Sequence, residues 1–343
     1  MQNPKSKIEN KKILHFGIPT FQYTNWGKAS NLLITRIKIV ADYIEAKKSR
    51  LKYYQKIPLY YQTKERKLVL YKPAGKTIEE VRLEKELVPD KLYIKQEDKI
   101  KAIQVIQKVF NRQLSEDVRS NNPDKVKETL VNIVQETLAE PRSGSLEGVS
   151  ETVNILINEY TKDSDVIKNL LIVSKQDYST VIHSINVMAI VLGYANFIDC
   201  SLYDKKILGL SALLHDVGKT KIDTALLTAP RKLTDEEFNE IKQHTIRGHD
   251  ILSRCNFRYK EIATTALQHH EKLDGSGYPY GITNIEQTAQ IVGFIDCYEA
   301  LTNDDRPYRN AMSPLKTLKL IKQDVQSDKF SRNIFETFAY SLL

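Results

Sequence analysis

The sequence predicts a mainly α-helical protein with a small α/β part in its N-terminal third. Apolar residues recur at helical spacing from 100 to 109 and again from 126 to 138, which indicates amphipathic helices. Between residues 56 and 96 the pattern changes to short β-branched and aromatic runs separated by charged turns, which is typical of strands. The length of 343 residues is enough for two or three domains.

The N-terminal third can be assigned element by element. Residues 31–48 carry apolar side chains at helical spacing and end in lysines, so we expect a helix there. The α/β part then follows between the charged and Gly/Pro-rich turns. In chain order its expected elements are strands at 57–61 and 67–71, a short helix at 78–87 capped by Thr77, and a closing strand at 91–94.

The net charge of +8 is unevenly placed along the chain. Residues 1–140 contain 28 Lys and Arg against 17 Asp and Glu, whereas residues 141–343 contain 23 against 26. A basic N-terminal part is compatible with nucleic acid, an anionic lipid surface or an acidic partner. Because its lysines are scattered among Glu and apolar residues, we favour an ordinary solvated face and expect no nucleic-acid partner.

Two further features of the sequence bear on its location. No stretch approaches the roughly 18 to 20 uninterrupted apolar residues of a membrane span, and the first residues lead into no apolar signal segment. The three cysteines are widely spaced, odd in number and form no Cys-x-x-Cys pair. We therefore expect a reduced, cytoplasmic compartment and no membrane span.

The chemistry of the chain centres on Ser-Ala-Leu-Leu-His-Asp-Val-Gly-Lys at residues 211–219. His215 and Asp216 follow an apolar helix and present an imidazole and a carboxylate near its end. Alone the pair is weak evidence, because neighbouring residues point about 100° apart on a helix. Further histidines and a carboxylate strengthen it as a metal site, namely His183, His244, His269, His270 and Asp296. Lys219 is either a helix-end cation or a charge that stabilises a phosphoryl oxygen.

Two later stretches add candidates for ligand binding. His269-His270-Glu-Lys-Leu-Asp-Gly-Ser-Gly-Tyr278-Pro279 ends an apolar helix in a Gly-rich loop, which lets backbone approach a ligand. Arg306 and Arg309 lie in a charged loop and could grip phosphates. His249 is five residues after His244 and points to another face of its helix, so we interpret it as a surface residue.

These motifs together resemble the HD-GYP family, the branch of the HD phosphohydrolases that hydrolyses cyclic di-GMP in bacteria. The resemblance covers about residues 175–320 and keeps the order of the family's motifs. It implies a helical-bundle, HD-type metal-dependent phosphohydrolase domain. The implied metal ligands are His183, His215, Asp216, His244, His269, His270 and Asp296.

The resemblance also implies a reaction and its parts. The enzyme would be a cyclic-guanylate-specific phosphodiesterase that hydrolyses cyclic di-GMP to linear pGpG, or further to GMP, with Asp216 bridging the metals and Lys219 near the scissile phosphate. Tyr278, Arg306 and Arg309 would hold the phosphates. A His and carboxylate set without thiolates suits two divalent ions of iron or manganese better than structural zinc.

The sequence departs from the family pattern in places and leaves alternatives open. Ser179 stands where some members carry a Glu for a third metal, and Glu299 replaces an Asp; the spacing before Arg306 is also one residue longer. The alternatives are a non-catalytic cyclic di-GMP sensor and an HD hydrolase of another nucleotide.

We expect three parts in this chain, at residues 1–100, 101–150 and 151–343. The first is a small α/β regulatory domain, more weakly similar to domains that precede other HD-GYP domains. It would bind a protein partner or form a homodimer. The second is a helical connector, and the third is the HD-GYP catalytic domain.

Overall fold

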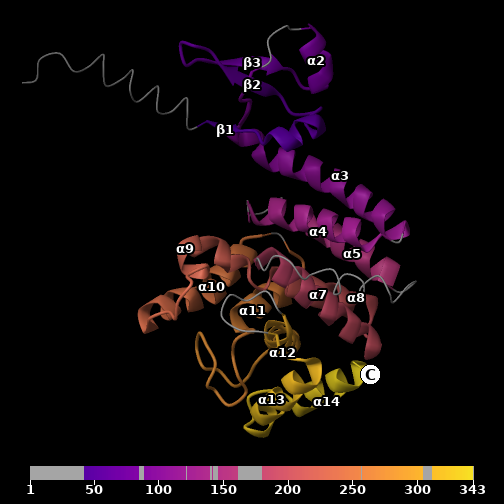
Figure 1. The fold of residues 1–343 in the computed structure, drawn as a ribbon, viewed down its shortest axis with the longest axis vertical. Coiled ribbons are helices and arrows are strands. Elements are labelled where there is room, and N and C mark those ends of the chain that lie inside the picture. The colour runs from indigo at the N-terminus through magenta and orange to yellow at the C-terminus, as the bar shows by residue number, and fades with distance from the viewer. Residues whose placement is uncertain are drawn as a thin grey trace, which may run out of the picture.

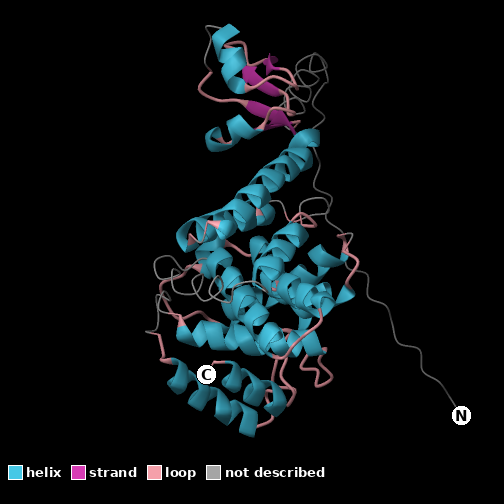
Figure 2. Cartoon of the chain, turned by 90° about the vertical axis from the view of Figure 1, so that its right-hand side faces the viewer, coloured by secondary structure: helices cyan, strands magenta, loops and turns pink. Residues whose placement is uncertain are grey.

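The computed structural model describes residues 42–84, 89–120, 122–139, 141, 146–160, 180–255, 257–303 and 311–342. Helices dominate these residues, and the strands described are confined to residues 43–95 (Figure 1 and Figure 2). The predicted fold class, mainly α with a small α/β part near the N-terminus, is therefore confirmed.

The α/β unit is built on a four-stranded antiparallel sheet in the order β1-β4-β2-β3. Its elements are β1 (Tyr43–Glu45), a 3₁₀ helix (Lys48–Tyr53), β2 (Leu59–Gln62), β3 (Leu68–Lys72), α2 (Ile78–Glu84) and β4 (Tyr93–Lys95). The predicted hairpin is present, with the amide of Thr63 donating to the carbonyl of Lys67 at 2.8 Å. Thr77 caps α2 as expected, because its hydroxyl accepts from the amide of Glu80 at 3.1 Å.

The predicted helix at 31–48 is wrong where the structure describes it. Residues 43–45 form strand β1, which pairs with β4 through Ile44 opposite Ile94. Tertiary pairing overrides the local helical spacing here, because an edge strand gains backbone hydrogen bonds and packs Ile44 against the core. Residues 31–41 lie outside the described residues. The strand predicted at 91–94 is present as β4, which lies between β1 and β2 in the sheet.

Three helices connect the α/β unit to the rest of the molecule. They are α3 (Lys99–Arg119), α4 (Pro123–Leu138) and α5 (Val149–Tyr160), and the first two confirm the helical spacing seen in the sequence. Lys47 and Arg50 of the α/β unit form ion pairs with the buried Glu136 of α4 at 2.9 and 3.1 Å. The domain boundaries at residues 100 and 150 stay a prediction.

The helical bundle follows α5 along the chain and lies below it in Figure 1. Its helices are α7 (Thr180–Phe197), α8 (Leu202–Leu214), α9 (Thr224–Leu227), α10 (Asp235–Ser253), α11 (Lys260–Gln268), α12 (Gln287–Thr302), α13 (Pro314–Gln326) and α14 (Arg332–Ser341). Helix α7 alone, among the described helices, is long and apolar enough to cross a membrane by length and composition. Most of it is buried inside the bundle, which accounts for its apolar character without a membrane.

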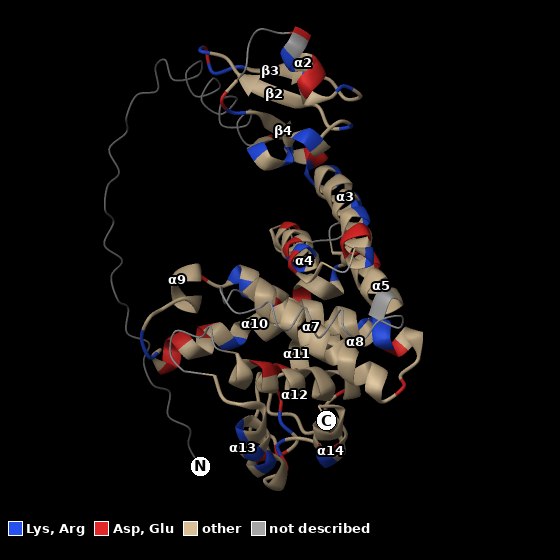
Figure 3. Cartoon of the chain, turned by 45° about the vertical axis from the view of Figure 1, so that its right-hand side comes forward, with Lys and Arg blue, Asp and Glu red and all other residues tan. Residues whose placement is uncertain are grey.

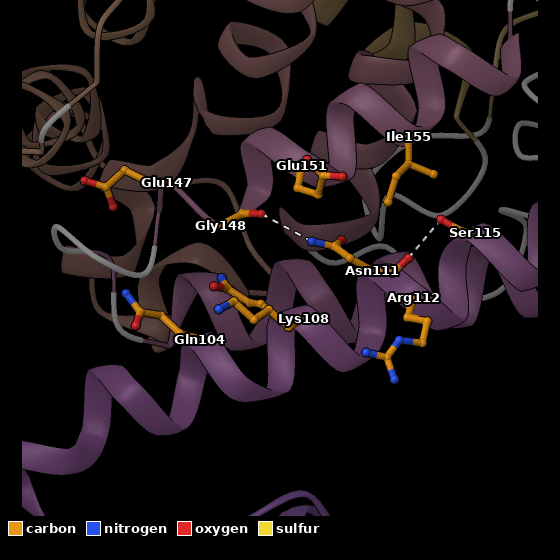
Figure 4. Close-up of a pocket in the computed structure, with 10 residues that line it drawn as sticks. Gln104, Lys108, Asn111, Arg112, Ser115, Glu147, Gly148, Glu151 and Ile155 are labelled. Atoms are coloured by element: carbon orange, nitrogen blue, oxygen red, sulfur yellow. Dashed lines mark hydrogen bonds between the residues drawn. The ribbon is translucent and has the colours of Figure 1, made fainter. Parts of the chain in front are cut away.

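The charges of the N-terminal part are mixed rather than gathered on one face. Figure 3 shows Lys and Arg beside Asp and Glu along α2 and α4. A groove of about 690 Å³ lies between α3 and α5, and residues of both charges line it (Figure 4). Lys108 and Arg112 lie on α3, Glu147 precedes α5, and Glu151 lies in the first turn of α5. None of the predicted site residues lines this groove.

Candidate metal centre

Helices α7, α8, α10, α11 and α12, with the loops at their ends, bring the seven predicted ligands together. His183 comes from α7, His215 and Asp216 follow α8, His244 comes from α10, His269 and His270 follow α11, and Asp296 comes from α12. Six of these residues form two groups, in each of which the ligand atoms lie within 4.8 Å of one another. One group holds His183, His215 and Asp216, and the other holds His244, His269 and His270.

Asp216 belongs to the first group but also reaches the second, because it turns one oxygen toward the histidines of each. Its Oδ2 is 3.4 Å from Nε2 of His215 and 3.7 Å from Nε2 of His183. Its Oδ1 is 3.3 Å from Nε2 of His244 and 3.9 Å from Nε2 of His269. A carboxylate in this position has the geometry of a bridging ligand.

Asp296 makes a second link between the two groups. Its Oδ1 is 2.9 Å from Nε2 of His183, and its Oδ2 is 3.8 Å from Nδ1 of His270. The His270 side chain is 23% exposed, whereas those of His183 and His215 are almost fully buried. The solvent-facing side of the centre is therefore the His270 side.

Backbone carbonyls fix the tautomer of three of these histidines. Nδ1 lies 2.7 Å from the Ala212 carbonyl in His215, 2.7 Å from the Ile241 carbonyl in His244, and 3.0 Å from the Ala266 carbonyl in His269. A carbonyl oxygen can only accept, so Nδ1 carries the proton in each ring. Nε2 then keeps its lone pair and points into the centre, as a metal ligand requires.

Glu299 orients His183 through the proton on Nδ1. Burial opposes the charge on His183, but Glu299 and Asp296 outweigh it and raise the pKa of this imidazole to about 9, so His183 must release its Nε2 proton to bind a metal. Nδ1 of His183 donates to Oε2 of Glu299 at 2.6 Å. The other oxygen, Oε1, accepts from Asn186 at 2.9 Å and from Asn303 at 2.8 Å. This carboxylate-to-histidine contact is typical of a group that orients a metal ligand. The sequence offered a signal for it, because Glu299 is three residues after Asp296 and so lies on the same face of α12.

Two glycines let the backbones around the centre approach closely. A Cβ added at Gly218 would lie 1.9 Å from the His244 carbonyl oxygen, and one added at Gly293 would lie 2.0 Å from the His269 carbonyl oxygen. Any larger side chain would therefore force these segments apart. Gly218 sets the distance from the His215-Asp216 loop to α10, and Gly293 sets the distance from α12 to the end of α11. Sequence reasoning missed both roles.

The Gly-rich loop folds back onto the end of α11. A Cβ at Gly277 would lie 2.4 Å from the Cα of Glu271, and the Glu271 side chain accepts from the amide of Tyr280 at 2.8 Å. This closure places the ring of Tyr278 against that of His270, with 4.7 Å between centroids. Burial, followed by the Asp296 and Asp216 carboxylates, raises the pKa of the Tyr278 phenol above its usual value. The hydroxyl is therefore a protonated hydrogen-bond donor at neutral pH.

The remaining predicted residues are placed as follows. Lys219 lies in the 3₁₀ turn Val217–Lys221, and its Nζ donates to Oδ2 of Asp216 at 2.5 Å. His249 is exposed on α10 beside Asp250 and Ser253, away from the centre. Arg306, Arg309 and Ser179 lie outside the described residues.

The electrostatics of the centre keep its carboxylates ionised. Burial opposes the charge on Asp216, but Lys219 and His215 outweigh it and hold the pKa of that carboxyl well below its usual range. Burial lowers the pKa of His244 to about 4, against the pull of Asp216. Burial, with His215 and His244 nearby, lowers the pKa of His269 to about 3. Two histidines are therefore neutral and ready to ligate at neutral pH.

These residues fit a metal. Oδ1 of Asp216 and Nε2 of His215 are buried and have no hydrogen-bond partner. Such atoms are costly in a folded protein unless something else binds them. Imidazole nitrogens and carboxylate oxygens without thiolates make a donor set for a divalent transition metal.

Comparison with known proteins identifies the class of this domain. Residues 168–334 match the family model described as HD domain. The chain is 28% identical over 191 residues to the cyclic di-GMP phosphodiesterase PA4108 of Pseudomonas aeruginosa, which is 55% of this chain and 45% of that protein. It is 36% identical over 119 residues to the 3′3′-cGAMP-specific phosphodiesterase 3 of Vibrio cholerae, which is 34% of this chain and 25% of that protein. The chain thus spans less than half the length of either relative.

A solved structure is similar over most of the chain. It is Bd1817, described as a HDG"Y"P protein from Bdellovibrio bacteriovorus, with a TM-score of 0.59 and 18% identity over 88% of this chain and 99% of that one. This likeness supports the fold. Residues 168–334 are thus similar to HD domains. The resemblance of the sequence motifs to the HD-GYP branch agrees with this match.

Proposed function

We propose that this protein is a metal-dependent phosphodiesterase that hydrolyses cyclic di-GMP to linear pGpG. The observation that carries the proposal is the position of Asp216, which turns one oxygen toward each of two histidine groups. An arrangement of this kind suits two metal ions that share one carboxylate. The name of the Pseudomonas relative supports cyclic di-GMP as the substrate.

Each side chain has a task in this proposal. Two divalent ions held by the seven ligands would supply Lewis acidity and lower the pKa of water. Lys219 is 24% exposed and donates to Oδ2 of Asp216, so its ammonium group lies beside the centre and can also face an anionic phosphoryl oxygen. The Tyr278 hydroxyl can donate to a phosphate oxygen. The resemblance assigns Arg306 and Arg309 to the other phosphate contacts.

The identity of the metal and the end product follow from the same residues. Nitrogen and oxygen ligands without sulfur favour iron or manganese. Ser179 cannot replace the Glu that would hold a third metal, which supports release of pGpG as the main product. The α/β unit would then serve as the regulatory part and bind a partner protein or a second copy of the chain.

The test is an anaerobic assay of the whole chain with cyclic di-GMP. Protein stripped with a chelator is reloaded with iron, manganese or zinc, and pGpG and GMP are separated by chromatography. We expect pGpG to form with iron or manganese and to persist. The stripped protein is the control and should be inactive.

Three other outcomes would change the proposal. Binding of cyclic di-GMP without turnover in metal-loaded protein would favour a sensor. Faster turnover of 3′3′-cGAMP than of cyclic di-GMP would make 3′3′-cGAMP the preferred substrate. Turnover of neither, with hydrolysis of another nucleotide, would favour a different HD hydrolase.

A further inference from the structure

Two aromatic rings lie side by side beside the metal centre. Phe238 stands on α10, six residues before His244, and is 44% exposed. Its ring centroid is 6.3 Å from that of Tyr278, with the planes at 76°. Tyr278 in turn lies against His270, whose side chain is partly exposed. The rings therefore form a continuous path from the metal ligands to the surface.

A lysine completes this group. Nζ of Lys242 lies 4.7 Å from the ring centroid of Phe238 and 5.7 Å from that of Tyr278. Lys242 follows Phe238 by one helical turn, and its Nζ also donates to Asn239 at 3.1 Å. The cation is therefore held over both rings rather than extended into water.

A single exposed Phe is ordinary on a protein surface and needs no special explanation. Phe238 differs because its ring contacts a residue that touches the metal centre and carries a positioned cation. An exposed aromatic face binds a nucleobase by stacking, and the Lys242 ammonium group, once the base has displaced it from the ring, can donate to the O6 and N7 acceptors of guanine. Neither Phe238 nor Lys242 has a role in the proposed reaction.

We infer that Phe238, Lys242 and Tyr278 form a purine subsite of the metal centre, in which Phe238 stacks on one base and Lys242 recognises it as guanine. The inference rests on the proposed function, since it takes the substrate to be a cyclic purine dinucleotide. It names residues on α10 that lie outside the motifs of the resemblance.

The first test compares Phe238→Ala with the wild-type chain. Base stacking is worth about 1–3 kcal/mol per base, so KM for cyclic di-GMP should rise by roughly 5- to 150-fold while kcat and bound metal stay constant. Phe238→Tyr keeps an aromatic face and should keep most of the binding. Phe197→Ala is the matched control, because Phe197 is 52% exposed at the far end of α7.

The second test concerns the choice of base. Lys242→Met keeps the length of the side chain and removes its donors. The ratio of kcat/KM for cyclic di-GMP over cyclic di-AMP should fall by about fivefold or more, because a good base contact is worth about 1–3 kcal/mol. An unchanged ratio would contradict the role of Lys242.

The outcomes separate the subsite from the reaction. If the wild type hydrolyses cyclic di-GMP and Phe238→Ala leaves KM unchanged, the subsite is wrong and the proposed function stands. If the wild type hydrolyses no cyclic dinucleotide, the proposed function is wrong, and calorimetric binding of pGpG decides the subsite. Binding that weakens in Phe238→Ala supports it; equal binding, or none, overturns it.

Discussion

Lys72 in the α/β unit and Asp216 in the helical bundle are both buried charged side chains, but their surroundings satisfy them differently. Lys72 is fully buried, and its Nζ donates to three backbone carbonyls, those of Gln55 at 3.3 Å, Pro73 at 2.9 Å and Lys76 at 3.0 Å. Every ammonium proton has an acceptor. Burial nevertheless lowers the pKa of Lys72, against the pull of Glu80.

Asp216 is buried with one oxygen that has no hydrogen-bond partner. Its histidine neighbours lie with their nitrogens at 3.3 to 3.9 Å, which is too far or too poorly aligned for good hydrogen bonds. A buried charged side chain with a complete set of hydrogen-bond partners, such as Lys72, therefore has a structural role. One with an incomplete set, such as Asp216, indicates a ligand-binding site. Changes at the two sites should therefore affect different properties.

The largest effect should come from Asp216→Asn. The amide keeps the shape of the side chain but removes the charge that faces both histidine groups. Turnover should fall by roughly a thousandfold, which is about 4 kcal/mol of transition-state stabilisation, and bound metal should fall with it. Steady-state rates measure the turnover, and elemental analysis measures the bound metal. Asp250→Asn, at an exposed carboxylate on α10, is the control. Normal turnover with a normal metal content would contradict the site.

Lys72→Met should have the second-largest effect, on stability rather than on chemistry. It leaves three carbonyl oxygens without a donor in the core of the α/β unit. Each such group costs about 1–3 kcal/mol, so we expect the free energy of unfolding to fall by about 3 kcal/mol. Denaturant titration measures it. Lys91→Met removes only an exposed ion pair with Glu45 and should leave the free energy of unfolding essentially unchanged. A loss of bound metal in Lys72→Met would contradict the purely structural role of Lys72.

Glu299→Gln should have an intermediate effect on the metal centre. The amide can still accept from Nδ1 of His183, but it no longer polarises that ring. Changes to such partners cost about 10- to 100-fold in metal affinity, so competition with a metal-binding dye should show a loss in this range. Glu240→Gln, at an exposed carboxylate paired with Arg247, should leave the affinity unchanged. Equal affinity in both variants would mean that Glu299 only fills space.

The smallest effect should come from Arg50→Lys, where the α/β unit meets the connecting helices. Arg50 donates to Glu136 and Asn132 at once, and its guanidinium lies 4.7 Å from the Phe110 ring centroid. Lysine keeps the charge but cannot make the forked contact. We expect a loss of about 1 kcal/mol in the free energy of unfolding, measured by thermal unfolding. No change would show that the charge of Lys47 alone is enough to satisfy Glu136.

The sequence predicted the helices, and the side chains that gather at their ends, better than it predicted the first strand or the supporting contacts. His215 and Asp216 were expected at a helix end, and they follow α8 directly. Thr234 and Glu237 form a full capping box on α10, which the sequence Thr-Asp-Glu-Glu at 234–237 contains as a local pattern. Ligand types are visible in sequence because metals accept few side chains. Strand β1 was missed because its pairing depends on residues about 50 positions later, which no local pattern contains.

Contacts between different packed helices could not be predicted from the sequence either. The closeness of Gly218 to α10 and of Gly293 to α11 appears only once the helices are packed. The group of Phe238, Lys242 and Tyr278 likewise joins α10 to a loop about 40 residues further on. Sequence spacing predicts neighbours within one helix, but it cannot predict which helices face one another.

Gly218 and Gly293 also offer a criterion for judging homologous sequences. A Cβ at either position would need more than 1 Å of extra space to reach an ordinary carbon–oxygen contact of about 3.3 Å. A misplacement of about 1 Å can cost a hundredfold in rate. A homologue could therefore keep every histidine and aspartate and still be inactive, if a larger residue has replaced one of these glycines. A check of the ligand residues alone would wrongly classify such a homologue as active.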